Sequence, residues 1–186
     1  MPVAEIDRAA AVRRALRTLV AEHGFHGASM TAVAAGADVA TGTAYTHYAS
    51  KDELVLATYL ETKAELGAAA TAGLDHDVEP AERFRELWLA AYRHLAGNRD
   101  HALFLLQVDS SPYKDRAHEA AMAREDPLTA QAAVPDLAER LLPLPLEVLY
   151  ELGLGPAIRL AAAGPELGAD ELGEVADACW RAISRP

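Results

Sequence analysis

The 186-residue sequence predicts an all-α protein, and three observations carry that prediction. Alanine, the residue with the highest helix propensity, is abundant along the whole chain. Apolar residues recur at the three- and four-residue spacings of a helix face. Runs of β-branched residues bounded by turn signals, which indicate strands, are missing. Hydrophobic residues make up 51% of the chain, enough to bury a core without disulfides or metals.

The first elements are two helices separated by a stop signal. Apolar residues at helical spacing predict a helix over residues 6–22. Gly24 suits a left-handed position just past the end of that helix. Ser29 is a good N-cap, so a short second helix is expected over residues 30–36.

A tight turn and a third helix come next. The pattern predicts a turn over residues 37–40 and a short helix over residues 41–48. Ser50, with Glu53 three residues on, forms a capping box that starts a longer helix at residue 51. Two short helices joined by a four-residue turn are the ingredients of a helix-turn-helix.

A helix-turn-helix has three demanding positions. It requires a small residue where its helices cross, a turn residue that tolerates left-handed geometry, and an apolar residue on the second helix. Ala34, Asp38 and Ala44 stand at these positions. Glycine suits the turn better, but aspartate is among the few other residues that adopt that conformation.

The remainder of the chain is also expected to be helical, with one irregular stretch. Expected helices with apolar faces cover residues 80–96, 112–125, 146–163 and 169–183, and a strongly apolar run covers residues 101–108. Pro80 suits the first turn of its helix. Four prolines make residues 127–145 irregular, and Gly155-Pro156 predicts a kink in the next helix.

Charge divides the chain unequally. The net charge is −11, but residues 1–54 account for only −1 of it, with five basic and six acidic side chains. The acidity of the rest keeps that part away from nucleic acid and in solution. Cys179 is the only cysteine, so an internal disulfide and a thiolate metal cage are excluded. No metal site and no cofactor is expected.

The sequence lacks the patterns that are typical of secreted proteins, membrane proteins and several classes of enzyme. The first residues do not have the form of a signal peptide, and no apolar stretch is long enough to span a membrane. A reducing cytoplasm is the expected location, with no membrane partner. Catalytic signatures such as a nucleophile elbow, a phosphate loop or a zinc-protease helix do not occur, so an enzyme is not expected.

The helix-turn-helix region carries a specific order of residues. Read in sequence, it contains Phe25, Ser29-Met30, Val33-Ala34, Val39, Gly42-Thr43, Tyr45, His47-Tyr48 and Ser50-Lys51-Asp52-Glu53-Leu54. This order resembles the signature of the TetR (tetracycline-repressor-like) family of bacterial transcription regulators. Three positions depart from it. Asp38 replaces a turn glycine, Ala40 a capping serine, and Ala44 a larger apolar residue.

The resemblance implies an N-terminal three-helix DNA-binding domain, residues 1–50, and a helical effector-binding and dimerisation domain, residues 51–186. It also implies that the helix over residues 41–48 lies in the major groove of operator DNA. The residues expected to contact DNA are Ser29, Thr31, Thr41, Gly42, Thr43, Tyr45, Thr46, His47 and Lys51. Thr41 and Thr46 suit a base edge or a thymine methyl, and Lys51 suits a phosphate. Arg8, Arg13 and Arg14 are expected to add outer contacts to the DNA backbone.

The resemblance further implies a small-molecule effector and a homodimer. The effector site is expected among Leu56, Tyr59, Leu60, Trp88, Tyr92, Phe104, Leu105, Gln107, Val108, Tyr113 and His118. The dimer interface is expected at Leu146, Leu149, Leu152, Ile158, Val175, Cys179 and Ile183. The alternative for both sets is ordinary core packing within one chain.

Two functions remain open at this point. The first is a repressor that binds a palindromic operator as a homodimer and is released by a small apolar or aromatic effector. The second is a helical sensor or interaction protein of the same fold, with weak or lost DNA binding. The net charge of −1 in residues 1–54 and the Asp38 and Ala40 departures motivate the second.

Overall fold

The computed structural model describes residues 3–124, 126–164 and 167–185, with the side chains of residues 3–7 outside the description. Within these ranges the chain is helical and contains no strand beyond an isolated bridge between Leu141 and Ser184. The all-α prediction is therefore confirmed. Two compact units divide the chain: residues 1–63 with 103–124, and residues 64–102 with 125–186.

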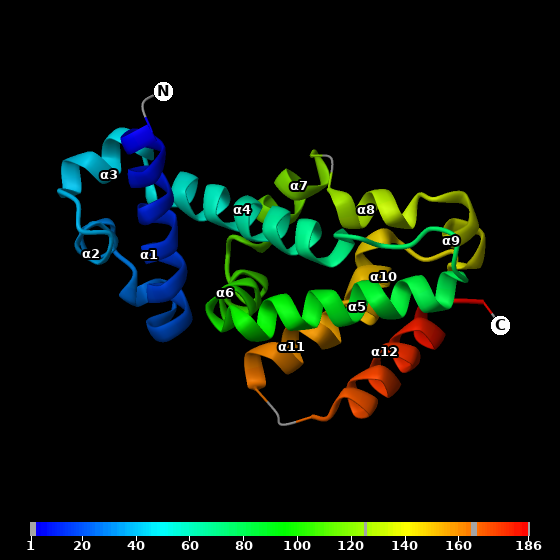
Figure 1. Cartoon of the computed structure of the whole chain (residues 1–186). Coiled ribbons are helices and arrows are strands. Elements are labelled where there is room, and N and C mark those ends of the chain that lie inside the picture. The colour runs from blue at the N-terminus through cyan, green and yellow to red at the C-terminus, as the bar shows by residue number, and fades with distance from the viewer. Residues whose placement is uncertain (1–2, 125, 165–166, 186) are drawn as a thin grey trace. The chain divides into compact units, whose positions relative to one another are not determined.

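The first unit begins with three helices, drawn in blue and cyan in Figure 1. These are α1 (Val3–Gly27), α2 (Met30–Gly36) and α3 (Thr41–His47). They pack on one another because each has an apolar side: Leu16, Val33 and Ala44 are completely buried. The helix α4 (Lys51–Thr71) starts in this unit and continues into the second, whereas α6 (Arg99–Asp109) starts in the second unit and continues into the first. The short α7 (Lys114–Met122) completes the first unit.

Helix α1 differs from the expectation at its end. It continues to Gly27, but Gly24 interrupts it with φ 65° and ψ 179°. The positive φ confirms the need for glycine at this position, whereas the left-handed helical conformation predicted for it is wrong. The extended ψ changes the direction of the chain, and the Phe25 ring lies 4.9 Å from the ring of Tyr113, the N-cap residue of α7.

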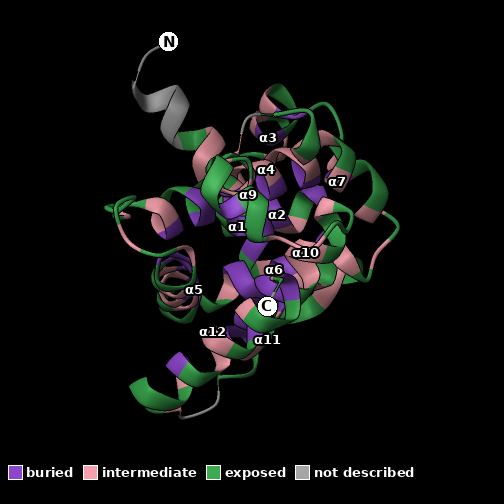
Figure 2. Ribbon diagram, turned by 90° about the vertical axis from the view of Figure 1, so that its right-hand side faces the viewer, coloured by how far each residue is buried: buried purple, intermediate pink, exposed green. Residues whose placement is uncertain are grey.

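The second unit is built around α5 (Pro80–Gly97), which contacts both α11 (Gly155–Ala163) and α12 (Ala169–Ile183). Figure 2 shows buried residues, in purple, along these helices. Trp88 is fully buried, and its indole Nε1 donates a hydrogen bond of 3.0 Å to the Gly153 carbonyl. This bond satisfies the one polar atom of a large apolar side chain.

The proline-rich stretch is more regular than the sequence indicates. It contains α8 (Pro127–Ala132) and α9 (Pro135–Arg140), each with its proline in the first turn. The expectation of irregular chain over residues 127–145 is wrong for these two segments, because proline at a first helical position removes no helix hydrogen bond. The predicted kink near Gly155 is confirmed: α10 (Leu146–Gly153) ends there and α11 begins. The helix expected over residues 112–125 is shorter, at Lys114–Met122.

Candidate nucleic-acid interface

The turn between α2 and α3 has the predicted local chemistry. The Ser29 hydroxyl accepts a hydrogen bond of 3.1 Å from the Ala32 backbone N–H and caps α2. Asp38 has a φ of 54°, the left-handed geometry in which few residues other than glycine are comfortable. Ala40 stands at the N-cap of α3 with extended backbone and no side-chain hydrogen bond. One backbone N–H in the first turn of α3 therefore lacks the side-chain acceptor that a serine at position 40 would supply.

The outward side of α3 consists of small and polar residues. Gly42, Tyr45 and Thr46 are exposed, and their spacing of three and four residues places them on one helix face. Tyr45 keeps 50% of its surface exposed, which is unusual for an aromatic residue of this size. Ala44, on the opposite side, is completely buried. The exposed side is therefore available to a partner.

The remaining residues expected at DNA lie around this face. Thr41, Thr43, His47 and Lys51 are partly exposed, and Ser29 and Thr31 are exposed at the start of α2. The Thr46 hydroxyl donates to the Gly42 carbonyl at 2.9 Å. Tyr48 is 6% exposed and belongs to the core.

Lys51 makes a contact that the sequence did not predict. Its Nζ donates a hydrogen bond of 2.5 Å to the Phe25 carbonyl and lies 5.9 Å from the centre of the Phe25 ring. Partial burial lowers the pKa of this ammonium group, an effect that neighbouring Asp52 opposes. The ammonium has three protons, so two of them remain for another acceptor.

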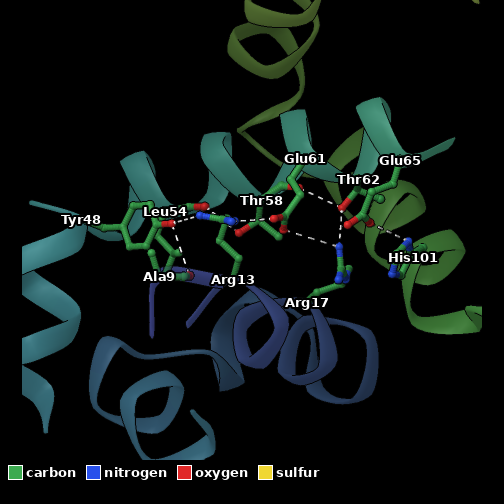
Figure 3. Close-up of polar contacts among 10 residues, drawn as sticks. All are labelled: Ala9, Arg13, Arg17, Tyr48, Leu54, Thr58, Glu61, Thr62, Glu65 and His101. Atoms are coloured by element: carbon green, nitrogen blue, oxygen red, sulfur yellow. Dashed lines mark hydrogen bonds and ion pairs between the residues drawn. The ribbon is translucent and has the colours of Figure 1, made fainter. Parts of the chain in front are cut away.

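Helix α1 is joined to α4 by a line of polar contacts, shown in Figure 3. Arg13 donates through Nη2 to Glu61 Oε1 at 2.6 Å and through Nη1 to the Tyr48 hydroxyl at 2.5 Å. The bond to Glu61 raises the pKa of the Arg13 guanidinium, and burial opposes the rise. Arg17, which is 4% exposed, donates to Thr62 Oγ1 at 3.1 Å.

These contacts correct the expectation for Arg13. Its guanidinium is engaged inside the first unit, so the outer contact with the DNA backbone expected of it is not supported. These contacts could not be predicted from the sequence, because their partners lie 35 to 48 residues apart. The only sign of these contacts in the sequence was arginine at helical spacing, Arg13 and Arg17, in a helix that also has an apolar face.

Helix α7 contacts the start of α4. Asp52 accepts hydrogen bonds from the Tyr113 hydroxyl at 3.2 Å and from Arg116 Nη1 at 3.1 Å. Burial, followed by the Asp52 charge and hydrogen bond, raises the pKa of the Tyr113 phenol. The two side chains thus fix α7 against the residue next to Lys51.

The residues expected at the effector fall in both units, with only Trp88 and Tyr92 in the second. Five of the set are buried: Tyr59, Trp88, Phe104, Leu105 and Val108. Leu56, Leu60, Tyr92, Tyr113 and His118 are partly exposed, and Gln107 is exposed. In the first unit His118 Nε2 lies 2.9 Å from Asp109 Oδ1, and the His118 ring stacks on Tyr59 with centroids 6.1 Å apart.

The residues expected at the dimer interface divide by exposure. Ile158, Cys179 and Ile183 are buried within the chain, while Leu146, Leu149 and Val175 are partly exposed. Leu152 is 42% exposed, and Leu144 and Val148 are each 39% exposed. Burial raises the pKa of the Cys179 thiol, consistent with an apolar core position.

The described residues lack both a metal-binding cluster and a membrane-spanning helix. No group of three or more His, Cys, Asp or Glu side chains there is arranged to hold a metal ion. None of the helices described is both long and apolar enough to cross a membrane.

Comparison with known proteins places the chain in a family. Residues 3–58 match the model of bacterial regulatory proteins of the tetR family, and residues 80–184 match a tetracyclin repressor-like C-terminal domain. The chain is 29% identical to an HTH-type transcriptional regulator of Haemophilus influenzae over 190 residues, which cover 100% of both proteins.

Solved structures agree with these matches. A TetR-family transcriptional regulator from Haemophilus influenzae is similar with a TM-score of 0.81 and 27% identity, over 99% of this chain and 100% of that one. A TetR-family regulator from Marinobacter aquaeolei also has a TM-score of 0.81, over 100% of both chains, and at 19% identity shows the shared fold alone. The chain therefore belongs to the TetR family of bacterial transcriptional regulators and carries a helix-turn-helix DNA-binding domain.

Proposed function

We propose that this regulator represses transcription by occupying a palindromic operator as a homodimer, and that a small apolar or aromatic effector releases it. The single observation that carries the DNA-binding part is Gly42. A Cβ built at this position meets no atom of the protein within 4 Å. Glycine in a helix costs up to about 1 kcal/mol relative to alanine, and nothing in the fold requires it here. A glycine on the exposed side of α3 is explained by the close approach of a partner such as DNA.

The polar residues around Gly42 support the same proposal. Thr41 and Thr46 are assigned to base edges, and Thr43, Tyr45 and His47 to phosphates. Ser29 and Thr31 supply further hydroxyls at the start of α2. Lys51 is assigned to a phosphate through the protons that the Phe25 carbonyl leaves free.

The experiment that tests this part is a matched pair of glycine substitutions. Gly42→Ala is expected to raise the melting temperature slightly and to weaken DNA binding at least tenfold, because the added methyl keeps the backbone away from the groove. Gly97→Ala is the control, since a Cβ at Gly97 also meets no atom within 4 Å. Equal DNA affinity of Gly42→Ala and wild type contradicts the assignment of this face.

A stripe on α10 supports the dimer. Val148 and Leu152 lie one turn apart on α10, Leu144 lies two residues before this helix begins, and all three large apolar side chains are exposed. Isologous contact between two such stripes buries them in a two-fold dimer. Leu146, Leu149 and Val175 flank this contact, while buried Ile158, Cys179 and Ile183 support it from within. Val148→Asp is expected to give a monomer by light scattering, with the helical content unchanged.

The effector proposal depends on the polar pair in the first unit. Asp109 and His118 lie 2.9 Å apart and are each about a quarter exposed, beside the buried ring of Tyr59. A polar pair next to an aromatic ring suits a ligand that is mostly apolar and has one hydrogen-bonding group. A thermal-shift screen of small apolar compounds tests it. Compounds that stabilise wild type but not His118→Ala support the proposal, and a screen without stabilising compounds contradicts it.

One observation favours the second function, a sensor with weak DNA binding. Of the five arginine and lysine side chains in residues 1–54, Arg13 and Arg17 both lie within 4 Å of Glu61. These two cations are used inside the protein, which lowers the charge available for phosphates. DNA binding of ordinary strength and steep salt dependence excludes this alternative.

A further inference from the structure

The exposed face of α3 contains few groups that can form the usual bonds to bases. The seven residues of the whole helix are Thr41, Gly42, Thr43, Ala44, Tyr45, Thr46 and His47. Arginine and lysine, which bind guanine through O6 and N7, do not occur among them, and neither do asparagine and glutamine, which bind adenine. Reading of bases by paired hydrogen bonds is therefore not available to this helix.

Thr46 is restricted further by its own hydrogen bond. Its hydroxyl donates to the Gly42 carbonyl at 2.9 Å, one helical turn earlier. A threonine hydroxyl has one proton, so this bond leaves the oxygen only as an acceptor. The bond also fixes the side-chain rotamer, and the residue remains exposed. Thr46 therefore offers a partner its γ-methyl group and an oxygen that can only accept a hydrogen bond.

Gly42 and Tyr45 flank this methyl group on the same face. Open space surrounds the position of a Cβ at Gly42, so a base pair can approach the helix closely there. The Tyr45 ring, half exposed, adds a second apolar surface. The apolar group that the major groove presents is the C5 methyl of thymine.

We infer that this regulator reads its operator mainly through thymine C5 methyl groups, with the Thr46 methyl as the specificity-determining contact. The inference rests on the proposed DNA binding and deepens it by naming the feature of the DNA that is recognised. Contact with one methyl group contributes about three- to tenfold in affinity, which is the effect of burying one small apolar group.

The experiment begins with duplexes that the full-length protein enriches from a random pool. In an enriched duplex each thymine is replaced in turn by deoxyuridine, which removes the methyl and leaves the base-pairing edge and O4 unchanged. We expect a three- to tenfold loss of affinity at one or two thymines in each half-site. Replacing guanines by 7-deazaguanine, which lacks the N7 acceptor, is expected to change affinity by less than about twofold.

Two substitutions of Thr46 assign the contact. Thr46→Val keeps a methyl at this place and removes the hydroxyl, so it is expected to remain sensitive to deoxyuridine. Thr46→Ser keeps the hydroxyl and removes the methyl, so it is expected to bind thymine and deoxyuridine duplexes equally. Thr18→Ser, at an exposed position of α1, is the control for loss of a threonine methyl from a helix.

The outcomes separate this inference from the proposed function. Enrichment of duplexes whose affinity is indifferent to deoxyuridine, or an unchanged sensitivity in Thr46→Ser, overturns the methyl readout and leaves DNA binding intact. Failure to enrich any duplex overturns the proposed function, and the methyl readout with it.

Discussion

Arg13 Nη2 of α1 lies 2.6 Å from Glu61 Oε1 of α4, across 48 residues of sequence. Both side chains are less than a quarter exposed, so the pair is only partly screened by water. The same carboxylate lies 3.9 Å from the buried guanidinium of Arg17 through its other oxygen. One acidic side chain therefore neutralises two arginines of the helix that supports the helix-turn-helix.

The first prediction concerns this carboxylate. Glu61→Gln is expected to lower the free energy of unfolding by about 1 to 3 kcal/mol, because it removes the negative charge that faces two largely buried guanidinium groups. Urea denaturation measures the change. Glu86→Gln, at an exposed position of α5, is the control and should leave the stability within about 0.5 kcal/mol of wild type. If the urea midpoint of Glu61→Gln equals that of wild type, the ion pair adds no stability.

The second prediction concerns the start of α3. Ala40 has the extended backbone of an N-cap and lacks a side-chain acceptor. Ala40→Ser supplies one for the backbone N–H groups of the first turn, and the expected gain is about 1 kcal/mol. Slower hydrogen exchange in α3 is the direct measurement.

Ser29→Ala is the matched comparison, because it removes the cap that α2 has. It is expected to destabilise by about the same amount. If Ala40→Ser leaves exchange in α3 unchanged, the missing cap is not what limits the stability of this helix.

The third prediction concerns charge beside Lys51. Asp52 is held by Tyr113 and Arg116, yet it remains half exposed at the start of α4. Asp52→Asn removes one negative charge next to the proposed phosphate contact. DNA affinity is expected to rise about two- to threefold at 0.1 M salt, and the gain to vanish at high salt. Asp77→Asn, in an exposed loop of the second unit, should have no such effect. A gain that persists at high salt points to a cause other than charge.

The fourth prediction concerns pH. The Asp136 carboxylate accepts a hydrogen bond from Arg83, whose side chain is 2% exposed, at 2.5 Å. The hydrogen bond from Arg83 lowers the pKa of Asp136 below its ordinary value. A lowered folded-state pKa stabilises the protein above the unfolded-state value, near pH 4, and that stabilisation is lost as the pH falls through the folded-state value.

Asp136→Asn is therefore expected to lower the melting temperature at pH 7. The difference from wild type should shrink steadily below about pH 4, where wild type also loses this carboxylate charge. Asp177→Asn is the comparison, because its partner Arg85 is 43% exposed and water compensates the loss. A difference for Asp136→Asn that is constant from pH 7 to pH 3 assigns the effect to something other than this ion pair.

The features that sequence reasoning predicted depend on local chemistry. The cap at Ser29, the left-handed geometry of Asp38 and the break near Gly155 each follow from a residue and its nearest neighbours. Family resemblance then predicted that α3 is the helix that contacts DNA, because the matching residues lie within one continuous segment.

The contacts that were not predicted join segments that lie far apart in the sequence. The bond from Trp88 to the Gly153 carbonyl and the contacts of Arg13 with Glu61 join residues 48 to 65 positions apart. Periodicity places such residues on a face but does not name their partner. The contact of Lys51 with Phe25 was missed for a related reason, since the kink at Gly24 decides where that carbonyl lies.

The central claim is that this chain is a DNA-binding repressor, and one measurement tests it most directly. Purified full-length protein is titrated against the intergenic DNA upstream of its own coding sequence, over a range of salt concentrations. Saturable binding, selective over random DNA, that weakens steeply with salt and involves two chains per site is the predicted result. Binding no tighter than to random DNA at low salt, from a folded dimer, contradicts the account and favours the sensor without an operator.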